Sequence, residues 1–147
     1  MFVLTRFPLP PSSNQLYASV RGRLIKSMEG RKYDNLVQLF KLKKFKELDR
    51  IQKELNDGSV INIETIFVFA KNRIIGKKGQ VKKLDTSNRI KTCHDGLAKI
   101  LEIDDSLFKS MQASTATCLN QQDEQVIVVL SKSQIKTLEE IKQNLNI

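Results

Sequence analysis

Hydrophobic and polar positions alternate most clearly between residues 60 and 70. This stretch is rich in β-branched and aromatic side chains, which predicts a strand with one buried face. The predicted buried face consists of Ile61, Ile63, Thr65, Phe67 and Phe69. Shorter strands are predicted over residues 2–8, where prolines end the run, and over residues 20–26. Residues 10–14 have the composition of a loop.

Four other segments have the pattern of helices: 28–40, 42–56, 87–101 and 133–145. Three of them carry apolar stripes at helical spacing, namely Phe45, Leu48, Ile51 and Leu55; Ile90, Cys93, Leu97 and Ile100; and Ile135, Leu138, Ile141 and Leu145. Ser133 is the predicted N-cap of the last helix. We expect its stripe to join the core, with a contact between two copies of the chain as the alternative.

Two further strands are predicted over 107–118 and 125–131, joined as an antiparallel pair by the polar turn 120–124. The strand that begins at Leu107 could also pair beside the strand 60–70. This order of elements suits an α+β or mixed α/β domain, in which helices cover one mixed sheet. The length of 147 residues indicates one domain, spanning 1–147.

The charge of the chain suggests a polyanionic partner. There are 25 lysines and arginines against 16 acidic residues, which gives a net charge of +9. Nucleic acid is the leading candidate, and an anionic membrane surface is the lesser one. With one histidine, and with Cys93 and Cys118 outside any CxxC pair, a zinc site or Ser/His catalysis is disfavoured. The chain has no signal-peptide or membrane-span pattern, so we expect a cytoplasmic protein.

Basic residues are concentrated between residues 71 and 91. This window holds eight cationic residues and one acid, Asp85; the cations are Lys71, Arg73, Lys77, Lys78, Lys82, Lys83, Arg89 and Lys91. Residues 71–84 contain two glycines and are predicted to form a loop that follows a phosphate backbone. A solvated, disordered loop is the alternative. A second set of lysines, on the predicted helices 28–40 and 42–56, is interpreted as a solvated face, with DNA contact as the lesser option: Lys41, Lys43, Lys44, Lys46 and Lys53.

Acidic residues lie on either side of the predicted helix 87–101. Asp85 precedes the helix, Asn88, Lys91 and Asp95 share one of its faces, and the pair Asp104-Asp105 follows it. A carboxylate pair in a basic surface suits Mg²⁺, which needs only one or two carboxylates besides a substrate phosphate. A helix cap, a surface ion pair and a turn are the plainer interpretations of these residues. The two ends of the helix are also about 21 Å apart unless the chain returns.

Two groups of motifs resemble the RusA family of Holliday junction resolvases. Near the N-terminus, residues 9–17 are similar to the family's PPSxNxxY loop, and Arg21-Gly22-Arg23 and Glu29-Gly30 with Tyr33 follow it. In the middle, residues 84–105 are similar to the pattern D-x-[D/S]-N-x-x-K…D-x-L…DD, with matching spacing. The resemblance covers most of residues 5–130.

The resemblance implies a homodimer that binds four-way DNA junctions and cuts them with Mg²⁺, or with Mn²⁺ in its place. It places metal ligands at Asp85 and Asp105 and the essential lysine at Lys91, with Asp104 as a further ligand. Where well-known members have aspartate, this chain has Ser87, so either Ser87 acts through a water, or Asp95 substitutes, or metal binding is weak. The DNA-binding set adds residues near the N-terminus to the basic loop: Asn14, Tyr17, Arg21 and Arg23.

The sequence therefore predicts a bacterial or phage nuclease, associated with the nucleoid, that cleaves branched DNA in recombination or repair. The alternative is a binding module for DNA junctions or duplexes that has lost catalysis through the change at Ser87. A third hypothesis is a basic RNA-binding accessory protein. Aromatic residues for stacking on single strands are scarce, because the chain has two tyrosines and no tryptophan.

Overall fold

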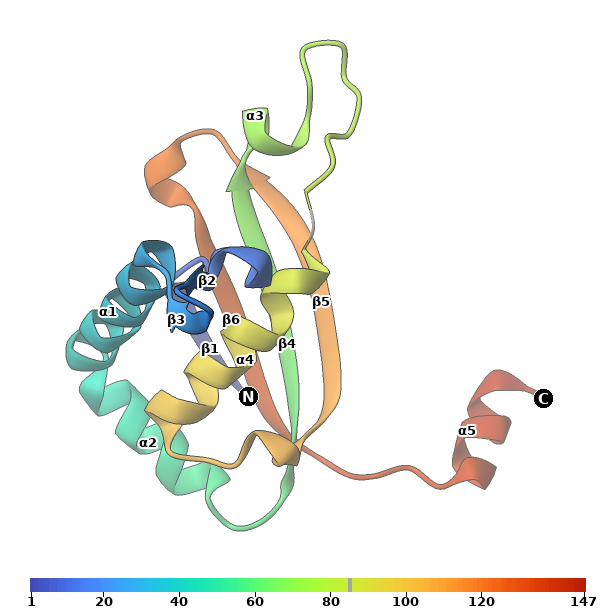
Figure 1. The fold of residues 1–147 in the computed structure, drawn as a ribbon. Coiled ribbons are helices and arrows are strands. Elements are labelled where there is room, and N and C mark those ends of the chain that lie inside the picture. The colour runs from blue at the N-terminus through green and yellow to red at the C-terminus, as the bar shows by residue number, and fades with distance from the viewer. Residues whose placement is uncertain (85) are drawn as a thin grey trace.

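A four-stranded mixed sheet forms the centre of the protein (Figure 1). The structure is a computed structural model that describes residues 1–84 and 86–147. The order across the sheet is β1-β6-β4-β5, and a hairpin of β2 and β3 lies apart from it. The strands are β1 (Phe2–Phe7), β2 (Tyr17–Val20), β3 (Arg23–Lys26), β4 (Val60–Ala70), β5 (Phe108–Cys118) and β6 (Gln125–Ser133). The predicted α+β class with one mixed sheet is confirmed.

Helices cover one face of this sheet (Figure 1). The helices are α1 (Met28–Lys43), α2 (Phe45–Leu55), α3 (Lys71–Ile74), α4 (Ser87–Leu101) and α5 (Leu138–Leu145), with short 3-10 turns η1 (Ser13–Gln15), η2 (Asp105–Leu107) and η3 (Gln121–Asp123). The predicted face of β4 is wholly buried against α1, α2 and α4, and its residue Thr65 is the polar member. Cys93 and Leu97 supply the α4 side of this core, as their spacing predicts.

Strands β5 and β6 are not partners, which corrects the predicted hairpin. Both pair with β4 but on opposite sides: β5 runs parallel to it, starting from Ile61 opposite Phe108, and β6 runs antiparallel. The most apolar strand thereby takes a central position, where both of its edges are hydrogen-bonded. The expectation that the strand after Leu107 pairs beside 60–70 is confirmed.

Two short segments are more structured than predicted. The strand expected over 20–26 is a hairpin of β2 and β3 with its turn at Arg21-Gly22, where both residues have positive φ. The loop expected over 71–84 begins with α3 and closes through a bridge between Ile75 and Val81.

The C-terminal helix differs most from its prediction. Ser133 belongs to β6, and α5 begins later, with Thr137 as N-cap in a reciprocal capping box with Glu140. Figure 1 shows α5 at the end of an extended segment, apart from the helices that cover the sheet. Its apolar stripe is exposed, with Ile135 at 71% and Leu145 at 62%. The expectation that this stripe joins the core is therefore wrong. None of the helices among the described residues is long and apolar enough to cross a membrane.

Candidate active site and nucleic-acid interface

The start of α4 is fixed against the edge strand β5. Thr86 and Thr115 share a hydrogen bond between their hydroxyl oxygens, 2.9 Å apart. Thr86 is the N-cap residue of α4, in an α-helical conformation, and its side chain makes no capping hydrogen bond. Ser87 and Asn88 belong to the first turn of α4, and Asp85 lies outside the described residues. The described residues at the start of α4 are therefore positioned by a strand–helix contact.

Lys91 and Asp95 lie on the exposed side of α4, as their spacing predicts. Their side chains form an ion pair of 3.3 Å, and the side chains are 81% and 49% exposed. An exposed i,i+4 pair of this kind contributes only a few tenths of a kcal/mol. The Lys91 ammonium can therefore leave Asp95 for a phosphate at little cost.

The acidic pair lies at the other end of α4. Asp104 accepts a hydrogen bond from the Ser106 amide at 2.9 Å, and this bond, together with the Ser106 side chain, holds the pKa of the Asp104 carboxyl below its usual value. Asp105 is exposed, within η2 and directly before β5. These two carboxylates are exposed, but they belong to a turn rather than to a preformed cluster.

Within one chain, Asp105 is far from the start of α4. The 15 residues of α4 span about 22 Å. Thr115, which contacts Thr86, is seven residues beyond Phe108 on β5, or roughly 23 Å along the strand. The length of α4 and the distance along β5 are therefore nearly equal. β5 runs back alongside β4 to the start of α4, but Asp105, which precedes β5, stays far from Ser87. Among the described residues, no group of three or more potential metal ligands is present.

Two arginines of the basic window have structural partners. Arg73 donates to both carboxylate oxygens of Glu124 at 2.8 Å, and Glu124 also accepts from the Ala70 amide. Arg89 is buried, and its guanidinium donates to the Pro10 carbonyl. The carbon centre of each guanidinium lies 5.3 Å from the centre of the Phe69 ring. These arginines thus connect α3, α4 and the proline segment, which their charge alone does not indicate.

The five lysines of the predicted loop are exposed, and most of them lie on the projecting hairpin after β4 (Figure 1). They are Lys71, Lys77, Lys78, Lys82 and Lys83. Gly76 and Gln80 close the tip through a backbone bond of 2.8 Å, and Gly79 has a φ of 78° that suits glycine. The hairpin therefore presents its lysines on an ordered turn rather than on a shapeless loop.

The predicted N-terminal contacts are also exposed. Asn14 lies in η1, Tyr17 begins β2 with 51% of its surface exposed, and Arg21 and Arg23 lie at the tip of the β2–β3 hairpin. The base of this hairpin is closed by the Ser27 amide, which donates to the Leu16 carbonyl at 2.8 Å. The four residues form a second exposed surface, separate from the lysine hairpin in sequence.

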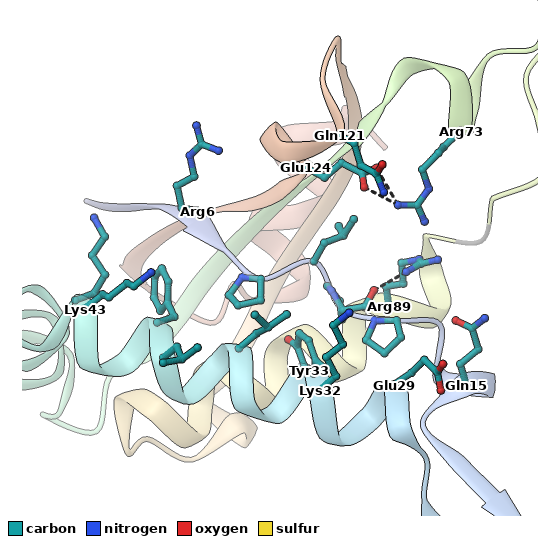
Figure 2. Close-up of a pocket in the computed structure, with 18 residues that line it drawn as sticks. Arg6, Gln15, Glu29, Lys32, Tyr33, Lys43, Arg73, Arg89, Gln121 and Glu124 are labelled. Atoms are coloured by element: carbon teal, nitrogen blue, oxygen red, sulfur yellow. Dashed lines mark hydrogen bonds and ion pairs between the residues drawn. The ribbon is translucent and has the colours of Figure 1, made fainter.

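A cleft that the sequence did not predict lies between α1 and the α3–η3 end of the sheet (Figure 2). Its volume is about 740 Å³. The proline segment from Pro8 to Pro11 forms part of its wall, and Arg89 places it next to the first turn of α4. No spacing rule could have found it, since its walls come from five separate parts of the chain.

Comparison with known proteins gives one family. The family model described as endodeoxyribonuclease RusA matches residues 8–131. No protein with a curated description matches the chain. Among solved structures, 2C-methyl-D-erythritol 2,4-cyclodiphosphate synthase from Plasmodium vivax is similar at 10% identity, over 90% of this chain and 95% of that one, with a TM-score of 0.28. That likeness is too slight to bear on fold or function.

Proposed function

Because this chain belongs to the endodeoxyribonuclease RusA family, we propose that it is a Mg²⁺-dependent nuclease that selects and cuts branched DNA. Enzymes of the family are Holliday junction resolvases and depend on a divalent metal ion. The observation that carries the proposal is the position of the α4 start, which lies between the exposed lysine hairpin and the basic cleft. We further propose that residues 1–147 act as one domain in a bacterial or phage setting.

The donors at the start of α4 fit Mg²⁺ better than a softer metal. Asp85 supplies a carboxylate in the sequence, and Ser87 and Asn88 supply neutral oxygens in the first turn of the helix. Mg²⁺ accepts such hard ligands and retains several waters, and Mn²⁺ can replace it. When bound, the metal polarises the phosphoryl group and positions water. Lys91, exposed and weakly paired, would neutralise charge that develops on the phosphate.

A second copy of the chain is part of this proposal. β5 is an edge strand of 11 residues in which only Phe108 is buried, and residues 110–118 carry no charge. Edge strands normally avoid pairing with other chains through charges, prolines or a cover. The exposed stripe of α5 is a further uncovered apolar surface. Both features support a homodimer, which would present two equivalent sites to a four-way junction.

The proposed dimer also accounts for the distance between the acidic pair and the start of α4. Asp104 and Asp105 lie about one α4 length from Ser87 in their own chain, so they are poorly placed to share its metal. We propose instead that they complete the site of the second protomer. Each site would then combine Asp85 and Lys91 of one chain with Asp105 of the other.

A non-catalytic junction- or duplex-binding module is the second candidate. The neutral Ser87 favours it, because a hydroxyl attracts Mg²⁺ far less than a carboxylate does. The two candidates share the DNA-binding surfaces and differ only in the metal-dependent step.

Cleavage of a synthetic four-way junction, compared with its matched duplex, separates them. We expect Mg²⁺-dependent cutting that a chelator stops. Asp85→Asn and Asp105→Asn should abolish cutting but leave junction binding equal or tighter, because each change removes a negative charge near the phosphates. Lys91→Ala should stop cutting without lowering metal binding. Asp49→Asn is the control and should cut, since Asp49 forms an exposed i,i+4 pair with Lys53 on α2, outside the candidate site. Parent-like cutting by both aspartate variants would refute the assignment.

A further inference from the structure

The cleft beside α1 has a basic rim and an apolar floor. Six cationic and two acidic residues line it; the cations are Arg6, Lys32, Lys43, Lys44, Arg73 and Arg89. The acids are Glu29 and Glu124, and Glu124 forms an ion pair with Arg73 and accepts a hydrogen bond from the Ala70 amide. The floor includes Leu9, Leu36 and Leu39, and the last two are 43% and 50% exposed. The cleft therefore favours an anionic ligand that also has apolar surface.

Two of its lysines are available to such a ligand. Lys32 and Lys43 are exposed on α1, on the cleft side of the helix (Figure 2). Among the described residues, neither has a carboxylate within ion-pair distance; by contrast, Lys44 lies 3.5 Å from Glu47. Because unpaired ammonium groups release counterions when they meet phosphates, these two should contribute most to binding.

The backbone of β1 is distorted where it supplies Arg6 to this rim. Leu4 and Phe7 are both fully buried although they are three residues apart, so the strand needs an irregularity between them. Arg6 takes up that irregularity with a φ of 64°, an uncommon conformation for a residue other than glycine. Its amide donates to the Gln125 side chain at 2.8 Å, and its guanidinium donates to Asp123 at 3.1 Å. The bulge thus directs a cation out of the sheet beside the cleft.

Size and position identify the class of ligand. A volume of about 740 Å³ is typical of small-ligand pockets and too small for a duplex. Arg89, on the inner wall, is bonded to Pro10 and belongs to the first turn of α4 (Figure 2). A polymer of phosphates lying in the cleft would therefore pass directly to the candidate active site.

We infer that this cleft holds one strand of the DNA substrate as it leaves the α4 site. The inference rests on the proposed nuclease function and adds a binding subsite to it. Phosphates of the strand lie along Lys32 and Lys43, and its sugars contact the leucine floor. Tyr33 and Phe40, the aromatic residues among the described lining of the cleft, are buried and offer no stacking platform for bases, so we expect the subsite to be indifferent to sequence.

Equilibrium binding of the full-length protein to a labelled four-way junction, a duplex and a single strand tests the inference. The test variant is Lys32→Gln with Lys43→Gln. The matched control is Arg31→Gln with Lys46→Gln, which removes the same charge from exposed positions of α1 and α2 that do not line the cleft. Glutamine keeps helix propensity, and circular dichroism checks that both variants fold.

The test variant should bind the junction and the single strand more weakly than the control does. Its log–log salt slope should fall by about 1.4 on the single strand, for two lost phosphate contacts. Equal effects of the two variants would overturn the inference, and so would a loss confined to intact duplex. Cleavage by the parent protein is scored separately. If the parent cleaves the junction and the test variant binds DNA as tightly as the control, the cleft subsite is rejected and the nuclease function stands. If the parent does not cleave, the proposed function itself is rejected.

Discussion

Phe69 is a single residue whose role near the site could not be predicted from its residue type. The guanidinium carbons of Arg73 and Arg89 each lie 5.3 Å from the centre of its ring. One arginine holds Glu124 and the other holds the Pro10 carbonyl. At this scale the basic window divides into exposed lysines that can meet phosphate and arginines that hold the surrounding backbone in place.

His94 provides a prediction about pH. It is buried on α4 beside the Phe108 ring, and burial lowers its pKa below the ordinary 6.5, against a smaller opposing effect of Asp95. Below pH 6.5 the unfolded chain therefore takes up a proton more readily than the folded chain, and stability falls as the pH falls. We expect the free energy of unfolding to decrease from pH 7 to pH 5.5, by at most about 1.4 kcal/mol per pH unit from this group.

Urea unfolding at several pH values measures this effect. His94→Gln should flatten the dependence over that window, because glutamine does not titrate. A variant whose stability declines as steeply as that of the parent would show that other groups cause the decline.

Residue types alone predicted part of the site. The shared face of Lys91 and Asp95 followed from helical spacing and is confirmed. The partners of Arg89 and Arg73 could not be foreseen, since Pro10 and Glu124 are distant in sequence and reach them only through the fold. Asp85 lies outside the described residues, so its ligand role stays a prediction.

Among the elements, the lysine hairpin after β4 carries the clearest prediction. Replacement of four lysines by glutamine, Lys77, Lys78, Lys82 and Lys83, should weaken duplex binding and lower the log–log salt slope by about 0.9 for each lost contact. The control replaces four exposed cations on α1, α2 and α4: Arg31, Lys46, Lys53 and Lys99. Fluorescence anisotropy over a range of salt concentrations measures both. If the two sets change the slope equally, the hairpin is only a solvated surface.

The sequence predicted well the strands and helices whose buried face packs within the same chain. β4 and the covering helices have patterns that only a buried face explains. The predicted hairpin of β5 and β6 was wrong because the Ser-, Thr- and Ala-rich sequence of β5 specifies no register, so nothing showed that β4 lies between these two strands. The apolar stripe of α5 was wrongly assigned to the core. A helix that packs on the core of its own chain and a helix that packs on another chain have the same sequence pattern.

Three features of the whole molecule belong together. The strand β5 lies at the edge of the sheet, the apolar residues of α5 are exposed, and the candidate acidic ligands precede and follow α4 in the sequence. The proposed two-fold dimer would account for all three features. α5 lies beyond residues 8–131, the part that matches the family model. The central claim is therefore that the nuclease site is shared between two protomers.

The most direct test of this claim is junction cleavage by a purified heterodimer of Asp85→Asn and Asp105→Asn chains, made by co-expression with two different tags. Each variant alone should be inactive. If sites are shared, the heterodimer contains one site with both aspartates intact, and it should nick one strand of a four-way junction in Mg²⁺. A heterodimer as inactive as either homodimer, under conditions in which the parent protein cleaves, would contradict the shared site.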